Sequence, residues 1–365
     1  MSFFNPDGAA VETARRRHGA VWRNEEVDYV PILMSGPRHA EQKRFPAYHL
    51  KECYYDREKM LISHTWGMIS ICNGGGDAAP SMRCNTGVGT LATVFGCVSS
   101  VFEDKMPWIT EHPTKEQLRR FEPVDIAEKG EMPRVLDYMS YFAEKLDGRA
   151  RVYAADNQGP LDLAHIVYGD RLFTDLYDDP AFVHELLDKC TRVIMDGVKL
   201  MKQAVGEPVE SGHHSNGLYM TNGGIRVCED TTTLLGASMV EEFAMPYTAR
   251  VLTAFDGGWV HFCGGEWRLL EQMVTLPGCR GVNFGNPERF DFEEVFGLLR
   301  ERGQFYFGNV PRQAGESLED WFRRILVGLG GRRGGLILRT GVGGDDGCSA
   351  PEAVALWRTL QDEML

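Results

Sequence analysis

The chain has 365 residues, of which 43% are hydrophobic and 25% are charged, a composition typical of a folded globular protein. Its formal net charge of −13 argues against nucleic acid or an anionic membrane as a partner, because both attract clustered Lys and Arg. No apolar run reaches ~18 residues and the start lacks the apolar core of a signal peptide, so we expect neither a transmembrane helix nor export. The nine cysteines are an odd number without CxxC spacing, which favours a reducing cytoplasm.

Eight β-rich runs alternate with segments of helical periodicity along the chain. This alternation is typical of βαβ units with a parallel sheet, and eight strands close a TIM barrel. We therefore predict one α/β domain over residues 1–365, a (β/α)8 barrel, with a doubly wound open sheet as the alternative. The predicted strands are YVPILM from Tyr29, MISIC from Met68, RVYAA from Arg151, PVESGHH from Pro208, WVHFC from Trp259, GVNFG from Gly281, QFYFG from Gln304 and LILRT from Leu336.

Capping residues predict several helix boundaries between these strands. An Asp-Pro pair at residues 179–180 predicts a helix start, and Gly206 is the expected stop. Ser238, Ser317 and Ser349, each followed three residues later by an acidic residue, predict further helix starts.

The segment from residue 73 to residue 125 follows neither periodicity. It is rich in Gly, Thr and Asn, as in GVGTLATVFG, and it carries no Walker or dinucleotide spacing. We predict that it is an insertion after the second strand, at the barrel mouth, where loops commonly carry function.

The segment WVHFCGGEW carries the most informative side chains. Because side chains alternate between the two faces of a strand, Val260 and Phe262 suit the outer face, and Trp259, His261 and Cys263 point inward. The last two lie at the C-terminal end of the strand, which is the active-site face of such barrels. A histidine and a cysteine two residues apart on one face can hold a borderline cation such as Zn²⁺.

Cys348 is the predicted third ligand. It follows strand LILRT and the loop GVGGDDG, and it directly precedes a predicted helix, whose N-terminus favours a thiolate. Neighbouring Asp345 and Asp346 oppose that effect. The alternative is a hydrogen-bonded His261, a buried Cys263 and an incidental loop cysteine.

Six further side chains are predicted at the strand ends around the mouth. Glu210 and His214 in PVESGHH would face inward, Glu210 as a fourth ligand or general base and His214 as a substrate-binding or proton-relaying group. The alternative pairs Glu210 with a barrel Arg or Lys as structural filling. Asn157 and Gln158 follow RVYAA on a tight turn and are suited either to orient a ligand or to serve only the turn. Weaker candidates for substrate binding are Asn283 and Arg339.

Three segments resemble the uroporphyrinogen decarboxylase superfamily. NQGPLDLAHIVYGDRLFTDLYDDPAFVHELLDKCT resembles its QGP, glycine and DDP segment, CEDTTTLLGASMVEEFAMPYTARV with VHFCGG resembles the next landmark, and WRNEEVDYVPIL resembles the entry into the first strand. The resemblance implies a (β/α)8 barrel. The segment SGPRHAEQKRFPAY departs from the arginine-rich motif of the decarboxylases proper, which argues against decarboxylation in the haem pathway.

The other branch of that superfamily contains methyltransferases that act with corrinoid proteins. Their zinc site is an HxC followed much later by a cysteine, and it activates a thiol. His261, Cys263 and Cys348 match that layout, and GGDDGCSAPEAV loosely resembles the surroundings of the branch's last ligand. The resemblance implies Zn²⁺, a separate corrinoid protein and a small-molecule substrate; a homodimer is compatible with it.

The leading hypothesis is therefore a zinc-dependent methyltransferase that moves a methyl group between a corrinoid protein and a thiol or related acceptor. The second is a metal-free lyase on a carboxylated substrate, with Glu210, His214 and Arg339 as its polar participants. The third is a non-catalytic ligand-binding barrel. Metal content separates the first hypothesis from the other two.

Overall fold

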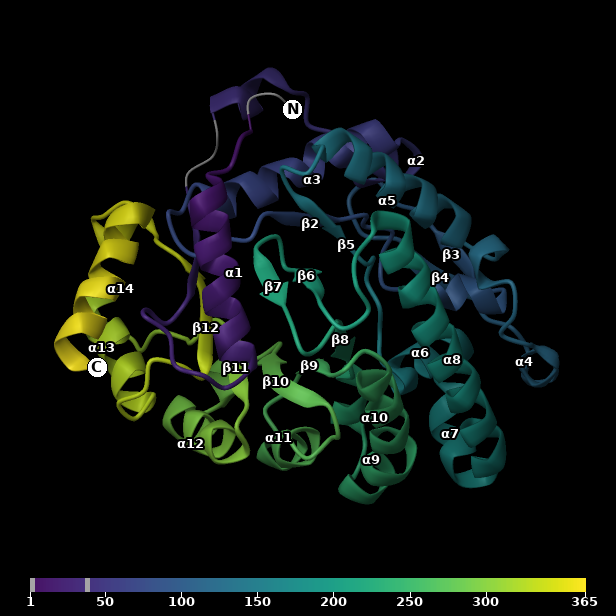
Figure 1. Ribbon diagram of the computed structural model, residues 1–365. Coiled ribbons are helices and arrows are strands. Elements are labelled where there is room, and N and C mark those ends of the chain that lie inside the picture. The colour runs from purple at the N-terminus through teal and green to yellow at the C-terminus, as the bar shows by residue number, and fades with distance from the viewer. Residues whose placement is uncertain (1–3, 37–39) are drawn as a thin grey trace.

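The computed structural model describes residues 4–36 and 40–365, and it confirms the (β/α)8 barrel (Figure 1). Six strands form one parallel sheet in the order β8-β9-β10-β11-β12-β1, and β2 pairs with β5, also in parallel. The barrel strands are β1 (Ile32–Ser35), β2 (Ser81–Arg83), β5 (Arg151–Tyr153), β8 (Ile225–Cys228), β9 (Gly258–Phe262), β10 (Cys279–Phe284), β11 (Phe305–Gly308) and β12 (Leu336–Gly341).

Loop contacts join the barrel at the two places where the strand ladders are interrupted. Between β1 and β2, the amide of Asp77 donates to the carbonyl of Ile32 at 2.8 Å. Between β5 and β8, the amide of Gly159 donates to the carbonyl of Cys228 at 2.6 Å. These bonds satisfy backbone groups that a continuous ladder would otherwise pair.

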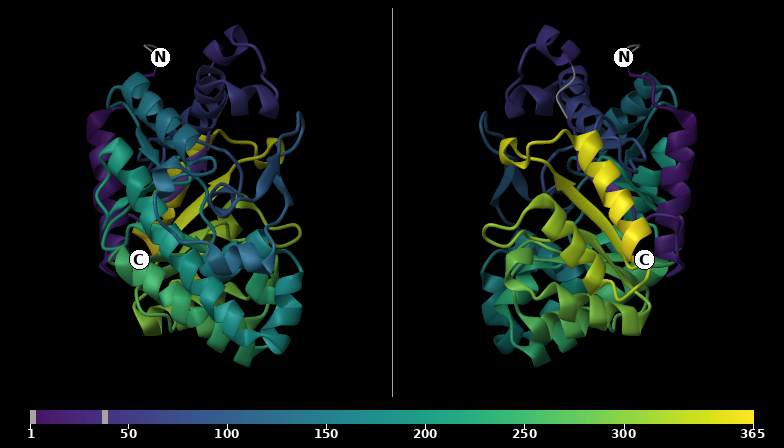
Figure 2. Two further views of the ribbon diagram at one scale, coloured as in Figure 1. Left: turned by 90° about the vertical axis from the view of Figure 1, so that its right-hand side faces the viewer. Right: turned by 90° about the vertical axis from the view of Figure 1, so that its left-hand side faces the viewer.

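Helices surround the barrel on its outer side (Figures 1 and 2). They are α1 (Gly8–Trp22), α2 (Leu50–Tyr55), α3 (Arg57–Cys72), α4 (Lys115–Arg120), α5 (Met132–Leu146), α6 (Pro160–Tyr168), α7 (Arg171–Asp178), α8 (Pro180–Val205), α9 (Ala237–Phe243), α10 (Met245–Ala254), α11 (Trp267–Met273), α12 (Phe292–Arg302), α13 (Leu318–Gly328) and α14 (Ala350–Met364).

Helix α1 and an antiparallel hairpin close the N-terminal end of the barrel. The hairpin consists of β6 (Gly212–His214) and β7 (Leu218–Met220), and α1 packs against β7. Trp22 of α1 lies 4.9 Å from Phe305 between ring centroids, within one apolar cluster that also contains Trp259. Figure 2 places the loop after β12 on the side of the molecule opposite α1, so the open mouth lies at that side.

The predicted register of β9 is confirmed. Val260 and Phe262 belong to the apolar cluster shared with the outer helices, and Trp259 belongs to the cluster inside the barrel. His261, between the two outward residues, therefore shares the interior face with Trp259.

Two of the eight predicted strands are wrong. The MISIC run lies in α3, which begins after Asp56, whose side chain accepts from the amides of Glu58 and Lys59; the second strand is β2 instead. The run from Pro208 supplies only the short β6, and the barrel strand at this position is β8. Short apolar runs suit a strand or a buried helix equally, which is why periodicity misassigned them.

The predicted insertion at residues 73–125 starts too early, because β2 lies inside it. The additional structure comes after β2 and contains a second hairpin, β3 (Val98–Ser100) with β4 (Trp108–Glu111), followed by α4. Figure 2 places this hairpin on the same side as the loop after β12, so the predicted position beside the mouth is consistent with the structure.

Three of the four predicted helix starts are confirmed. Helix α8 begins at Pro180 and ends before Gly206, which adopts φ 67°, and Ser317 and Ser349 precede α13 and α14. The start at Ser238 is wrong, since α9 already begins at Ala237 after Gly236.

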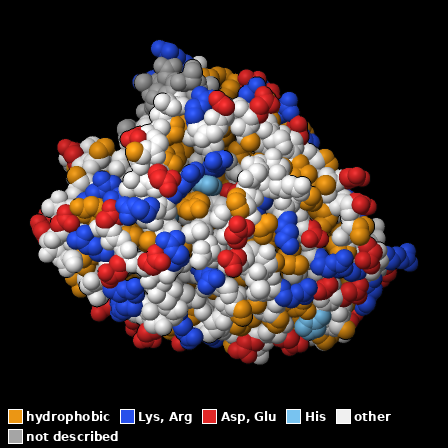
Figure 3. All heavy atoms as spheres, in the orientation of Figure 1, with side chains coloured by type: hydrophobic (Ala, Val, Ile, Leu, Met, Phe, Trp, Pro, Cys, Tyr) orange, Lys and Arg blue, Asp and Glu red, His pale blue; other side chains and the backbone are white. Residues whose placement is uncertain are grey.

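In the described ranges, no helix is long and apolar enough to cross a membrane. Figure 3 shows acidic and basic side chains interspersed over the face that carries α1, without a continuous basic patch there. The prediction that the chain does not bind nucleic acid remains a prediction.

Candidate metal and substrate site

Strand β9 carries His261 and Cys263 to the barrel mouth. His261 is the fourth residue of the strand and Cys263 follows the strand directly. The sulfur of Cys263 lies 3.9 Å from Nε2 of His261, and both side chains are partly exposed. The structure therefore brings together the two donors that the sequence predicted as neighbours.

The neighbouring strand β8 supplies two donors that the sequence analysis missed. Cys228 stands opposite His261 in the parallel ladder, and Asp230 follows the strand. Donor atoms of Cys228, Asp230 and His261 lie within 4.8 Å of one another, and Oδ1 of Asp230 is buried without a hydrogen-bond partner in the described structure. An orphaned carboxylate oxygen beside a thiol and an imidazole fits a borderline divalent cation.

Asn283 of β10 fixes the orientation of His261. Its Nδ2 donates to the carbonyl of Phe307 at 2.5 Å, so its Oδ1 is the atom that lies 2.6 Å from Nδ1 of His261. Because an amide oxygen can only accept, Nδ1 of His261 carries the proton and Nε2 is left free as a metal-binding lone pair. Both polar atoms of Asn283 are engaged, so this geometry favours an orienting role over the predicted contact with substrate.

The protein alone holds these thiols in the protonated form. Burial, followed by the carboxylate of Asp230, raises the pKa of Cys263 to about 12. Burial also raises the pKa of Cys228 well above its usual value, although Arg226 opposes this rise. Burial and then Arg226 lower the pKa of His261, which keeps the imidazole neutral. A divalent cation is the missing component that would favour thiolates here.

A buried carboxylate pair holds the loop that carries Asp230. Asp162 of α6 accepts from the amide of Asp230 at 2.9 Å and from the amide of Thr231 at 2.6 Å. Glu229 accepts from the hydroxyl of Thr248 at 2.5 Å. Burial raises the pKa of Asp162 to about 6 and raises the pKa of Glu229 well above its usual range. The pair thus positions Asp230.

Gly159, the glycine of the NQGP segment, permits this close packing. A Cβ at residue 159 would lie 2.2 Å from Oε1 of Glu229. The preceding Asn157 is buried and donates from Nδ2 to the carbonyl of Arg226 at 2.7 Å, and Gln158 is buried beside it. Asn157 therefore joins β5 to β8, which supports the structural interpretation of the turn over the ligand-orienting one.

Cys348 is not brought to the His261–Cys263 pair. It lies in the loop between β12 and α14, and the charged groups that act on it are Asp346, Glu352 and Arg312. Strand β12 is separated from β9 by two strands in the sheet order, so their loops leave the barrel at different points of the mouth. The three-ligand site predicted from the sequence is therefore only partly assembled in this geometry.

The predicted position of Glu210 is wrong. Glu210 is exposed and precedes the β6–β7 hairpin, and its carbonyl accepts from the amide of Gly223 at 3.0 Å, just before β8 begins. It therefore lies at the N-terminal end of the barrel, opposite the mouth, and cannot be a fourth ligand or general base there. The reason is that residues 208–211 are not in a strand, so alternation does not set the direction of this side chain.

His214 and Arg339 face the barrel interior, but His214 belongs to β6 of the hairpin at the closed end and not to the predicted mouth. The ring of His214 contacts Tyr153 at 5.0 Å and Trp259 at 5.2 Å between centroids. Arg339 follows on the same face of β12 as Ile337, which belongs to the interior cluster. His214 therefore lies deeper than the donors on β9.

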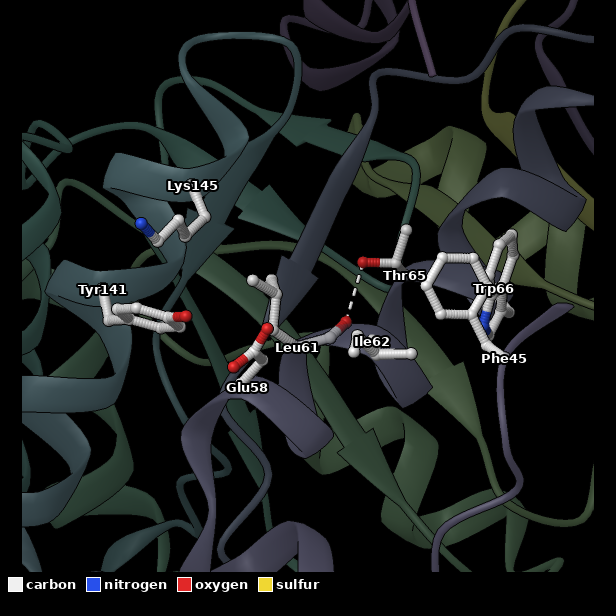
Figure 4. A pocket seen from close by; sticks show the side chains of 8 residues that line it. All are labelled: Phe45, Glu58, Leu61, Ile62, Thr65, Trp66, Tyr141 and Lys145. Atoms are coloured by element: carbon white, nitrogen blue, oxygen red, sulfur yellow. Dashed lines mark hydrogen bonds between the residues drawn. The ribbon is translucent and has the colours of Figure 1, made fainter. Parts of the chain in front are cut away.

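A separate pocket of about 330 Å³ lies on the outer layer of the molecule (Figure 4). Its lining side chains come mainly from α3 and α5, and Glu58 is the one carboxylate among them, with no lining histidine or cysteine. Figure 4 shows Glu58 and Lys145 on one side and Trp66 with Phe45 on the other. Its lining lacks the thiol and imidazole donors found at the mouth.

The fold and the residues at the mouth define the class of protein. It is a (β/α)8 barrel with thiol, imidazole and carboxylate groups on adjacent strands. A family model described as Uroporphyrinogen decarboxylase (URO-D) matches residues 13–311, and the chain belongs to this family. The resemblance of the sequence motifs is thereby confirmed.

Three similar proteins are titled methyltransferases. The "Methylcobamide:CoM methyltransferase MtbA" of Methanosarcina acetivorans is 24% identical over 281 residues, covering 74% of this chain and 76% of that protein. The protein of the same title from Methanosarcina mazei is 23% identical over 262 residues, covering 69% of this chain and 70% of that protein. A solved methyltransferase from Methanosarcina mazei shares the fold with a TM-score of 0.67 at 17% identity, over 96% of this chain and 98% of that structure.

Proposed function

We propose that the protein is a zinc-dependent methyltransferase that moves a methyl group between a corrinoid protein and a thiol or related acceptor, in the cytoplasm. The observation that carries the proposal is the oriented His261, which lies beside Cys263, Cys228 and an oxygen of Asp230 that makes no hydrogen bond in the described residues. The relatives titled methylcobamide:CoM methyltransferases support the same reaction class.

We assign His261 and Cys263 as two donors to zinc. The third donor has two candidates: Cys348, from the sequence layout, and the pair formed by Cys228 and Asp230, which already lie beside His261. Cys348 requires a rearrangement of the loop between β12 and α14, where a Cβ added at Gly344 would meet no atom within 4 Å. A catalytic site needs three protein ligands and one open position.

Bound zinc would supply a Lewis acid that lowers the pKa of a substrate thiol and so provides the nucleophile at neutral pH. The residues of this chain would bind the ion and orient its ligands. Asn283 keeps Nε2 of His261 directed at the donors, and Asp162 holds the loop of Asp230. The thiolate would then attack the methyl carbon, and the cobalt of the partner corrinoid would keep the bonding electron pair.

The test is a methyl-transfer assay with free methylcobalamin as the methyl donor and 2-mercaptoethanol as the acceptor. We expect zinc-loaded protein to demethylate the corrinoid, which is followed by the change in its visible spectrum, and to form the S-methyl product. His261→Gln should abolish turnover and retain the fold. Zinc-loaded protein without transfer for any thiol tested would contradict the proposal.

The second candidate is a metal-free lyase on a carboxylated substrate, and the arginines inside the barrel favour it. Arg339 lies there without a carboxylate partner in the described chain, as a carboxylate-binding group would. This activity would persist after chelation, whereas methyl transfer would not. Release of CO₂ by chelator-treated protein would identify the lyase.

A further inference from the structure

The pocket of Figure 4 lies between one face of α3 and the facing side of α5, on the outer layer of the molecule. Its lining residues on α3 recur at the spacing of a single helix face, and they are Glu58, Leu61, Ile62, Thr65 and Trp66. Tyr141 and Lys145 are four residues apart on α5, so their side chains are neighbours. Phe45, which precedes α2, completes the lining. The volume of about 330 Å³ is in the range of sites for small molecules.

One end of the pocket carries two opposite charges that do not pair with each other. Figure 4 shows Glu58, Tyr141 and Lys145 at this end. Glu58 makes no ion pair and no side-chain hydrogen bond in the part of the chain that the structure describes. Lys145 lies 3.4 Å from the adjacent Glu144, but 72% of that acidic side chain is exposed, so water weakens the pair. Both charges are therefore accessible to a ligand.

The two cations next to Glu58 in the sequence have other partners. Arg57 donates to both oxygens of Asp137, at 2.7 and 2.9 Å. Lys59 donates to Glu52 at 2.7 Å. Neither of these cations neutralises the carboxylate between them, so the polar end presents one carboxylate and one ammonium to the pocket.

The other end of the pocket is aromatic. The rings of Trp66 and Phe45 lie 5.2 Å apart between centroids, and Leu61 and Ile62 lie between the two ends (Figure 4). Trp66 follows Glu58 by eight residues, so the two ends are about 12 Å apart along the axis of α3. Trp66, Phe45 and Ile62 are each only partly buried, so an aromatic group placed here would remove further apolar surface from water.

We propose that this pocket binds a zwitterionic α-amino acid with a large aromatic side chain. The ligand's ammonium group pairs with Glu58, its carboxylate pairs with Lys145, and its ring extends toward Trp66. A simple amine would leave Lys145 unmatched, and a simple acid would place a second negative charge beside Glu58, whereas a zwitterion matches both groups. One hydrogen bond, the amino acid and one ring contact together span the length of the pocket. The site is separate from the proposed methyl transfer and does not depend on it.

The test is calorimetric titration of the full chain with L-phenylalanine and L-tryptophan, and with analogues that lack one charge. Phenethylamine and tryptamine lack the carboxylate, and 3-phenylpropionate and indole-3-propionate lack the ammonium. We expect at least one amino acid to bind with a dissociation constant of about 1 mM or below, and about 5-fold more tightly than both of its analogues, as one exposed ion pair provides. Absent binding of both amino acids, or an analogue that binds as tightly as its amino acid, would overturn the site. Binding that is lost in chelator-treated protein would overturn it as well, because it would place the amino acid on zinc.

Two variants assign the two charges. Lys145→Met should lower the affinity for the amino acid to that for its amine analogue, and Glu58→Gln should lower it to that for its acid analogue. Both side chains are exposed, so we expect both variants to fold and to keep their zinc content. Lys199→Met on α8 and Glu301→Gln on α12 are exposed matched controls and should bind as the unmodified protein does. A preference for the amino acid that survives in either pocket variant would overturn the site, whereas absent methyl transfer would count against the proposed function alone.

Discussion

The two ends of the barrel differ in how their aspartates are paired. At the closed end, Arg17 of α1 pairs with buried Asp77, which also accepts from the amide of Ile32. At the mouth, Oδ1 of Asp230 makes no hydrogen bond in the described residues and lies 3.7 Å from Nε2 of the neutral His261, and inside the barrel Arg339 has no carboxylate partner there. The buried carboxylate at the closed end is thus paired with a cation of the chain, whereas the carboxylate at the mouth has an oxygen that a bound cation could engage.

The largest expected effect on stability is at the closed end. Arg17→Met leaves Asp77 buried, with only Arg358 at 3.7 Å, and should lower the free energy of unfolding by about 3–5 kcal/mol. Urea unfolding measures this change. Zinc content per folded molecule should not change, and a simultaneous loss of zinc would show that the two ends are not independent.

For Cys263→Ala at the mouth we expect the opposite result, a loss of zinc binding with little change in stability. Zinc affinity should fall more than ~100-fold, beyond the loss seen when only an orienting partner is removed. The urea midpoint should stay near that of the unmodified protein, because a catalytic metal need not hold the fold. A variant that retains stoichiometric zinc would remove Cys263 from the site.

The single variants Cys228→Ala and Cys348→Ala test which cysteine is the third zinc donor, and the zinc content of the two variants is compared. Zinc loss in Cys228→Ala with zinc retained in Cys348→Ala assigns the donor set that the structure already assembles. The opposite pattern assigns Cys348 through movement of its loop.

His18 makes the closed end sensitive to acid. It is fully buried in α1, accepts from the amide of Tyr219, and burial lowers its pKa to about 4. Because the unfolded chain takes up a proton at about pH 6.5 and the native chain does not, the contribution of His18 to stability is complete above that pH and is lost as pH falls toward 4.

Between pH 7 and pH 5 this loss should reach about 2 kcal/mol for His18. His18→Gln should therefore show a smaller decrease in the free energy of unfolding over that interval. Identical pH slopes for the variant and the unmodified protein would contradict the buried neutral imidazole.

The smallest expected effect is at Asn283. Asn283→Ala removes the acceptor that holds Nδ1 of His261 and should weaken zinc binding about 10-fold. Competition with a chromogenic chelator measures the change. A loss as large as that of Cys263→Ala would indicate that Asn283 does more than orient the imidazole.

The sequence predicted the parts of the site that depend on one strand. His261 and Cys263 follow from the alternation of β9, which is local and strong because Val260 and Phe262 are apolar. The fold followed from the count and alternation of strands and from the family motifs, although two strands were misassigned. The sequence placed Asn157 correctly in the turn after β5, but a single sequence does not reveal its hydrogen bond to the carbonyl of Arg226 on β8.

The missed donors depend on a strand that is only four residues long. In IRVC the outward Ile225 and Val227 alternate with Arg226 and Cys228, which is a strand signal, but the preceding run PVESGHH obscured it. Cys348 could not be placed for a different reason. Its distance from His261 depends on the path of the loop between β12 and α14, which the spacing of residues along the chain does not determine.

The most direct measurement is zinc X-ray absorption spectroscopy of protein purified without chelator or a polyhistidine tag. We expect about one zinc per chain, with at least two sulfur ligands at ~2.3 Å and one nitrogen ligand at ~2.0–2.1 Å. Loss of a sulfur ligand in Cys263→Ala would place the ion at the barrel mouth. Protein that contains no zinc and takes none up, or a ligand shell without sulfur, would contradict the proposed site.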